Sequence, residues 1–174
     1  MSLRDFFISL SENQALSNAA HQYGLKLGAQ SVVAGTSLEE AITSIRKLNE
    51  QGISCTVDSL GEFVSDEGEA VKAKEEILAL IEAIHLEELD AHISLKPSQL
   101  GLDIDIDFCY DNLRDIVERA YEYGIFVNFD MEDYKRLQPS FDMLEELAKS
   151  FDNVGTVIQA YFHRAKDDAE QFKD

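Results

Sequence analysis

The chain has 174 residues, of which 45% are hydrophobic and 28% charged, with 34 acidic side chains against 15 lysines and arginines. This length and apolar content fit one ordered domain whose core needs no disulfide or metal. The formal charge of −19 repels phosphate backbones, and the sequence has no polybasic stretch, so we exclude nucleic acid as a partner. Cys55 and Cys109 lie far apart without zinc-site spacing, which predicts reduced, buried thiols.

Two helical segments are predicted first. Apolar residues recur at helical spacing through residues 1–30, which predicts an amino-terminal helical arm over residues 1–36. Residues 36–52 predict the next helix, with Ser37 as N-cap, acidic residues in the first turn and a glycine at the end. The amino terminus lacks the apolar run of a signal peptide, and no later stretch suits a membrane span, so we expect a soluble cytoplasmic protein.

Short apolar strands then alternate with long amphipathic helices. The strands are predicted at 53–58, 92–97, 125–131 and 155–162, and the helices at 67–89, 107–124, 140–151 and from 166 to the chain end. The strand starts lie 39, 33 and 30 residues apart, as in successive βα units. This alternation predicts a parallel sheet covered by helices.

The two faces of these strands differ in polarity. One face is apolar, whereas the other becomes polar toward the carboxyl ends, where Asp58, Lys96, Asp130 and Gln159 fall on four successive strands. A doubly wound sheet would be apolar on both faces. The pattern instead predicts an α/β fold of the (βα)8, TIM-like barrel class, with its chemistry at the carboxyl-terminal mouth.

The chain is short for such a barrel. A complete barrel takes about 250 residues, and only four βα units are predicted here. We therefore expect residues 37–174 to form the first half of a barrel, preceded by the arm at 1–36. The exposed strand edges of a half barrel favour pairing with another chain, so the protein is either truncated or completes itself as a homo-oligomer.

Several polar residues at the predicted mouth suggest chemistry. Lys96 alternates with apolar neighbours and suggests an anion or substrate site, although a surface lysine would also fit. Asp130 and Glu132 could hold a metal, act as a base or clamp an arginine, whereas Asp133 fits a solvated loop. The amide of Gln159 offers a donor and an acceptor, which suits a flavin ring or neighbouring side chains.

An alternating acidic stretch imitates a calcium loop. Residues 103–108 place aspartates at loop positions 1, 3 and 5, but Phe108 replaces the glycine at position 6 and Arg114 replaces the glutamate at position 12. We interpret the stretch as a loop leading into a helix, with Asp107 favourable to the helix dipole.

Five segments together resemble the bacterial single-function proline dehydrogenases over nearly the whole chain. They are LGAQSVVAGTSLEEA, SCTVDSLGEFV, SLKPSQLGLDID, GIFVNFDMEDY and GTVIQAYFHRAKDD. The resemblance implies a (βα)8 barrel flavoprotein of proline catabolism that binds FAD. It further implies an oxidoreductase that converts L-proline to Δ1-pyrroline-5-carboxylate and passes electrons to a quinone at the membrane surface.

The resemblance also implies roles for single residues. Lys96 matches the lysine that pairs with the substrate carboxylate, and Asp130 matches the catalytic-site aspartate of the DMED motif. Met131 and Gln159 match residues that contact the flavin and its isoalloxazine ring.

This chain departs from the family in two ways. Pro97 and Ser98 stand where the family often has an apolar residue and threonine, and Phe129 stands where isoleucine is common. The family's later arginines, which lie beside the flavin and hold the proline carboxylate, have no match. We therefore expect this chain to hold one wall of the site, to leave the charge of Asp130 uncompensated, and to be inactive alone with little or no retained FAD.

Two other functions remain open from the residues themselves. The first is a metal-assisted or Schiff-base barrel lyase or aldolase that uses Asp130, Glu132 and Lys96. The second is a non-catalytic half barrel that serves as an assembly module.

Overall fold

The computed structural model describes residues 34–172. The chain divides into two compact units, with the boundary in the sequence after Lys47, and each is described by itself. The predicted arm at 1–36 lies outside the described residues except for its last three positions.

The helix predicted at 36–52 is present as α3, Leu38–Asn49. The Ser37 hydroxyl accepts the Glu40 amide at 3.3 Å, as expected of an N-cap. The chain leaves the helix through Gly52, whose φ of +74° suits a residue without a Cβ.

The second unit alternates strands and helices in the predicted order. Its elements are β1 (Cys55–Asp58), α4 (Glu67–Leu86), β2 (Ala91–Leu95), the 3-10 turn η2 (Pro97–Leu100), α5 (Ile106–Glu122), β3 (Val127–Phe129), α6 (Tyr134–Ala148), β4 (Val154–Thr156) and α7 (Ala165–Gln171).

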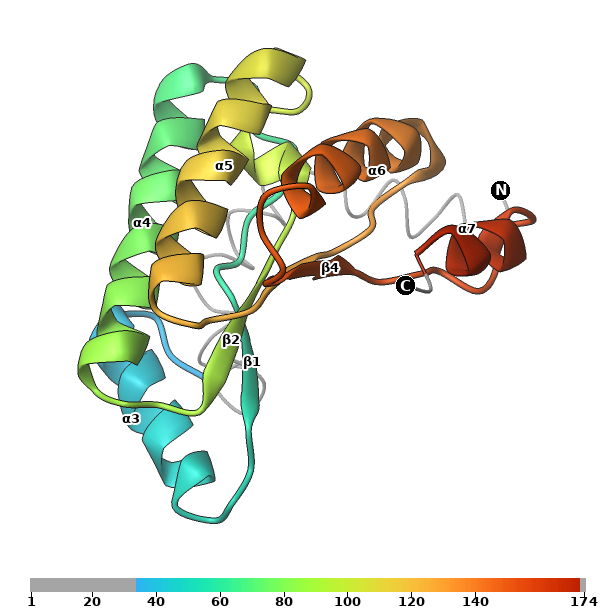
Figure 1. The fold of residues 1–174 in the computed structure, drawn as a ribbon. Coiled ribbons are helices and arrows are strands. Elements are labelled where there is room, and N and C mark those ends of the chain that lie inside the picture. Colours follow the sequence, from blue (N-terminus) through green and yellow to red (C-terminus); the bar gives the residue numbers. More distant parts are fainter. Residues whose placement is uncertain (1–33, 173–174) are drawn as a thin grey trace, which may run out of the picture. The chain divides into compact units, whose positions relative to one another are not determined.

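The strands form one parallel sheet of four strands in the order β1-β2-β3-β4. Each strand therefore pairs with the next one along the chain, without the reversal of strand order found in doubly wound sheets. Figure 1 shows α4 and α5 side by side along one face of this sheet. The described chain is thus a run of βα units of a TIM-like barrel, as predicted.

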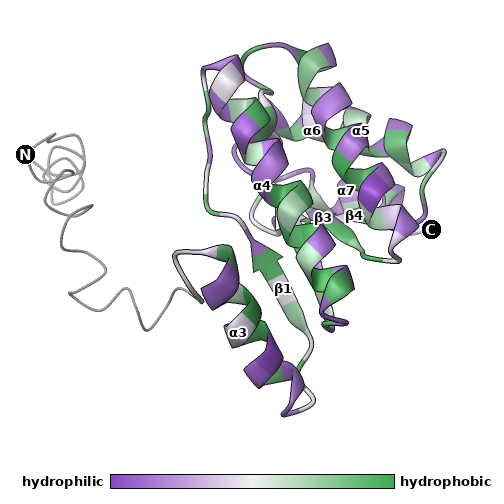
Figure 2. Cartoon of the chain, turned by 90° about the vertical axis from the view of Figure 1, so that its left-hand side faces the viewer, coloured by the Kyte–Doolittle hydropathy of each residue, from purple (hydrophilic) through white to green (hydrophobic). Residues whose placement is uncertain are grey.

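The core lies between the sheet and its helices. The strands contribute Ile93, Leu95, Val127 and Phe129, each at most 1% exposed. Facing helical residues at most 1% exposed include Ile77, Ile81, Leu113, Ile116, Val117 and Phe141. Hydrophobic and hydrophilic residues share each helix in Figure 2, as amphipathic packing requires. Each large apolar side chain buried here stabilises the fold by about 1.5–3 kcal/mol.

Two element boundaries differ most from the prediction. The fourth strand ends at Thr156, because β3 offers only Val127–Phe129 as hydrogen-bonding partners. Gln159 and Tyr161 therefore lie in the loop that follows the strand. Helix α6 begins at Tyr134, before Pro139, because the Asp133 carboxylate caps it by accepting the Arg136 amide at 3.1 Å.

No helix in the described part of the chain is both long and apolar enough to cross a membrane.

Candidate active site

Three charged side chains meet at the carboxyl ends of adjacent strands. Asp58 ends β1, Lys96 follows β2, and Asp130 follows β3. The parallel register places these ends side by side, with Asp58 opposite Ser94 and Phe129 opposite Leu95. The Lys96 Nζ lies 3.0 Å from Asp58 Oδ2 and 3.6 Å from Asp130 Oδ2. We call Asp58, Lys96 and Asp130 the charged cluster.

The charged cluster is only partly open to solvent. Its side chains are 21% exposed at Lys96, 25% at Asp58 and 32% at Asp130. Burial alone would lower the pKa of Lys96, but the hydrogen bond and charge of Asp58, followed by Asp130, outweigh it and raise that pKa. Lys96 is therefore an ammonium at neutral pH, and the cluster carries a net charge of −1. The Asp58 Oδ1 atom is buried without a hydrogen-bond partner among the described residues.

Two neutral side chains hold Asp130 in place. The Ser94 hydroxyl donates to Asp130 Oδ1 at 2.9 Å. The Asn128 amide donates to the same oxygen and to Ser94 Oγ, both at 3.0 Å. Sequence analysis did not select either residue for the site, although both lie on the same predicted strands as its candidates. The expectation that Asp130 would lack a counter-charge is wrong, because Lys96 supplies it.

Gln159 and Met131 form a separate polar contact beyond the strand ends. The Gln159 side chain donates to the Met131 carbonyl at 2.8 Å and accepts the Tyr161 hydroxyl at 3.2 Å. An amide group has two N–H bonds and two acceptor lone pairs, so these contacts leave one of each. The remaining N–H and the remaining lone pair match the acceptor and donor groups along the edge of a heterocycle. The Met131 side chain itself is 6% exposed.

Glu132 does not join the charged cluster, although strand alternation placed it on the same face. The strand ends at Phe129, and the Glu132 carboxylate turns to Ser98, accepting its amide at 3.1 Å and also its hydroxyl. Burial raises the pKa of Glu132 despite these hydrogen bonds. This geometry does not support a metal site built from Asp130 and Glu132. The raised pKa of Lys96 favours its protonated form, whereas formation of a Schiff base needs the neutral amine.

The remaining acidic candidates have structural roles. Asp133 caps α6, while Asp103 accepts the Arg136 Nε at 3.0 Å. The Asp105 carboxylate caps α5, and Asp107 lies in its first turn, as the helix-dipole interpretation predicted. Within residues 34–172, no group of three His, Cys, Asp or Glu side chains is arranged to hold a metal ion.

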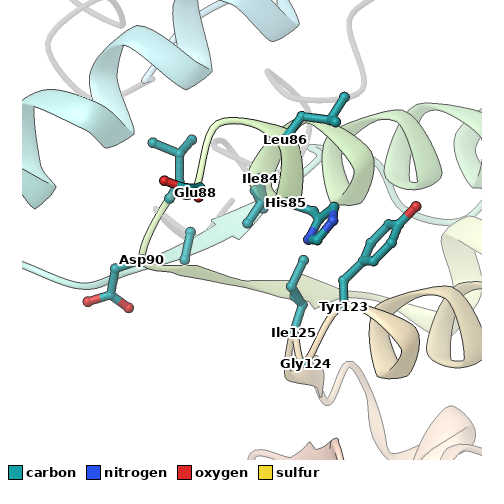
Figure 3. Close-up of a pocket in the computed structure, with 10 residues that line it drawn as sticks. Ile84, His85, Leu86, Glu88, Asp90, Tyr123, Gly124 and Ile125 are labelled. Carbon is teal, nitrogen blue, oxygen red and sulfur yellow. The ribbon is translucent and has the colours of Figure 1, made fainter.

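A hollow of about 510 Å³ lies at the opposite ends of the strands, where α4 leads into β2 and α5 into β3. Figure 3 shows His85 and Tyr123 beside each other at its wall. Their rings are stacked, with centroids 3.9 Å apart. Its lining is largely exposed, including His85, Glu88 and Asp90. The carboxyl ends of the strands, with their convergent charges, are the better candidate for an active site.

Comparison with known proteins identifies the family of this chain. A family model described as proline dehydrogenase matches residues 41–174. Proline dehydrogenase 2 of Bacillus subtilis strain 168 is 40% identical over 170 residues, which are 98% of this chain and 56% of the relative. Proline dehydrogenase of Deinococcus radiodurans is 32% identical over 176 residues, again covering 98% of this chain and 56% of the relative. This chain thus spans little more than half the length of these relatives.

A solved structure has the same fold. Proline utilization A from Bdellovibrio bacteriovorus, inactivated by N-propargylglycine, superimposes with a TM-score of 0.77 at 24% identity. The match covers 90% of this chain and 19% of that one. Since the family model matches well over half of the sequence, the chain belongs to the proline dehydrogenase family.

Proposed function

We propose that this chain forms one wall of the active site of an FAD-dependent oxidoreductase that converts L-proline to Δ1-pyrroline-5-carboxylate. The observation that carries the proposal is the Lys96 ammonium, held between Asp58 and Asp130 at the carboxyl ends of the strands in a chain of this family. A fixed ammonium at this place in a barrel suits the recognition of a substrate carboxylate.

Lys96 would bind the proline carboxylate, and Asp130 would help to position Lys96 before the substrate arrives. The longer of the two ion pairs, 3.6 Å to Asp130, is the one that an incoming carboxylate would replace at the smaller cost. Ser94 and Asn128 would keep Asp130 satisfied during that exchange, since both continue to donate to its Oδ1.

Gln159 and Met131 would hold the flavin. The unused N–H and lone pair of the Gln159 amide fit the ring edge, while the Met131 carbonyl fixes the amide orientation. When bound, FAD supplies hydride acceptance from the carbon next to the proline nitrogen. The chain's own residues would bind and orient the substrate for that transfer.

The surroundings of the reaction are part of the proposal. Membership of the family supports a quinone as electron acceptor and a cytoplasmic protein working at the membrane surface. We also infer that the chain alone retains little FAD and does not oxidise proline. Its cluster carries a net negative charge, so a substrate carboxylate needs further cations to bind.

The test combines this chain with the remainder of the Bacillus relative. The two polypeptides are purified separately, mixed with FAD and gel-filtered, and the visible absorbance of retained flavin is recorded before and after addition of L-proline. We expect flavin to be retained only by the mixture and to be bleached by proline. Flavin that is retained but not bleached by L-proline would overturn the proposed substrate. Flavin retained neither by the mixture nor by the separate polypeptides would overturn the cofactor assignment.

A variant pair tests the role of Lys96 within the mixture. Lys96→Met should keep the flavin but raise the proline concentration needed for bleaching by at least ten-fold, as loss of a charged hydrogen bond predicts. Lys72→Met is the matched control, because Lys72 is 78% exposed on α4 and forms an ion pair with its helix neighbour Glu76. Equal proline dependence in the two variants would refute the assignment of Lys96.

A further inference from the structure

The loop at 59–65, which joins β1 to α4, holds a residue in an unusual conformation. Phe63 has a φ of 56°, in the left-handed region that bulky side chains rarely adopt. Such a residue persists only where surrounding contacts enforce it, and these residues gather at functional sites. The loop follows directly on Asp58 of the charged cluster.

Ser98 supplies the contacts that hold this loop. The Phe63 amide donates to Ser98 Oγ at 2.9 Å, and the Val64 amide donates to the Ser98 carbonyl at 3.1 Å. Ser98 is 0% exposed, so solvent does not compete for these bonds. Beside them, the Gln99 side chain donates through Nε2 to the Ser59 carbonyl at 2.8 Å, which ties the start of the same loop to η2.

Glu132 fixes Ser98 from the other side. Its two carboxylate oxygens accept the Ser98 amide and the Ser98 hydroxyl. A chain of donors therefore runs from the Phe63 amide through the Ser98 hydroxyl to the half-buried carboxyl group of Glu132, and such a chain strengthens each of its bonds. The Arg136 guanidinium, which lies 4.5 Å from the Phe63 ring centroid, adds a second contact from α6.

The same serine also belongs to the backbone that carries Lys96. Lys96 is the N-cap residue of η2, and Ser98 lies within that turn. One buried serine thus joins the segment after Lys96 to the segment after Asp58, and Glu132 holds that serine by both of its polar groups.

We infer that Glu132 is a positioning residue: acting through Ser98, it holds the loop at 59–65 against η2 and thereby fixes Asp58 beside Lys96. Its consequence for proline binding rests on the proposed function, whereas the holding of the loop is a property of the chain itself.

Amide hydrogen exchange of the 174-residue chain tests this inference without flavin or substrate. Ser98→Ala should lower the protection of the Phe63 amide roughly ten-fold while sparing Val64, whose acceptor is a backbone carbonyl. Glu132→Gln should lower the protection of both amides, because a side-chain amide offers one acceptor oxygen where the carboxylate offers two. Ser98→Thr keeps the hydroxyl and should restore protection of Phe63.

The buried α5 amides of Ile116 and Val117 report whether each variant is folded. Glu76→Gln, on the exposed face of α4, is the control for loss of one carboxylate. Loop protection unchanged in Glu132→Gln, or lost equally in α5, would overturn the inference, as would a Ser98→Thr variant that behaves like Ser98→Ala. Failure of the flavin test leaves the exchange result intact, so the two proposals fail separately.

Discussion

Replacing Lys96 by methionine removes the one cation of the charged cluster and should destabilise the fold. Breaking a buried ion pair costs about 3–5 kcal/mol, whereas an exposed pair is worth less than about 1 kcal/mol. Lys96 and Asp58 are 21% and 25% exposed, so the pair lies between these limits. We expect a loss of about 2 kcal/mol in the free energy of unfolding.

Urea unfolding followed by circular dichroism measures this loss as a lower midpoint at an unchanged slope. Asp58→Asn in the Lys96→Met background should recover part of the loss, because it removes the carboxylate left without its partner. A midpoint equal to that of the Lys72→Met control would refute the reasoning. So would a double variant whose loss equals the sum of the two single losses.

Three further predictions concern other parts of the chain. Burial raises the pKa of Cys109 to about 12, and the charge of Glu132 is a second cause of the shift. Iodoacetamide at mildly alkaline pH should therefore label this thiol only after unfolding, which mass spectrometry would show. Burial raises the pKa of Glu132, so the folded protein keeps a proton that the unfolded chain has lost. The contribution of Glu132 to stability is then greatest below the ordinary carboxyl pKa and declines as pH rises through the raised value. In urea titrations, the free energy of unfolding of the wild type relative to Glu132→Gln should fall over that pH window. A difference between the two proteins that stays constant with pH would contradict this prediction. Asp105→Ala removes the cap of α5 and should cost about 1 kcal/mol, whereas an unchanged urea midpoint would show that the cap contributes nothing.

Sequence reasoning placed the strands and the charged cluster because both follow simple periodicities. Asp58 ends β1 opposite Ser94, and Lys96 and Asp130 directly follow the paired residues Leu95 and Phe129, so parallel pairing brings the three side chains to the same end of the sheet. The alternation of polar and apolar residues separated the helix-covered face from the other face, as the burial of Leu95 and Phe129 confirms.

The same alternation failed beyond the strand ends. Glu132 has the spacing of an inward residue, but the ladder stops at Phe129, after which side-chain direction depends on long-range contacts with Ser98. Gln159 was expected in a strand because its neighbours are apolar, yet its amide bonds the Met131 carbonyl from a loop. Neither contact has a local signal, because the partners lie 34 and 28 residues away. The roles of Lys96, Asp130, Met131 and Gln159 toward proline and FAD stay predictions, as does the division of the chain after residue 36.

The strand order β1-β2-β3-β4 also bears on how this chain acquires its structure. Since every strand pairs with its immediate successor, each new βα unit finds its docking surface already made by the unit before it. Pairing never waits for a distant segment, so loop-closure entropy stays small at every step and folding can advance from the amino end during synthesis. A chain built in this way adds the carboxylates and the lysine of the charged cluster one strand at a time, and the cluster is complete as soon as β3 has joined the sheet.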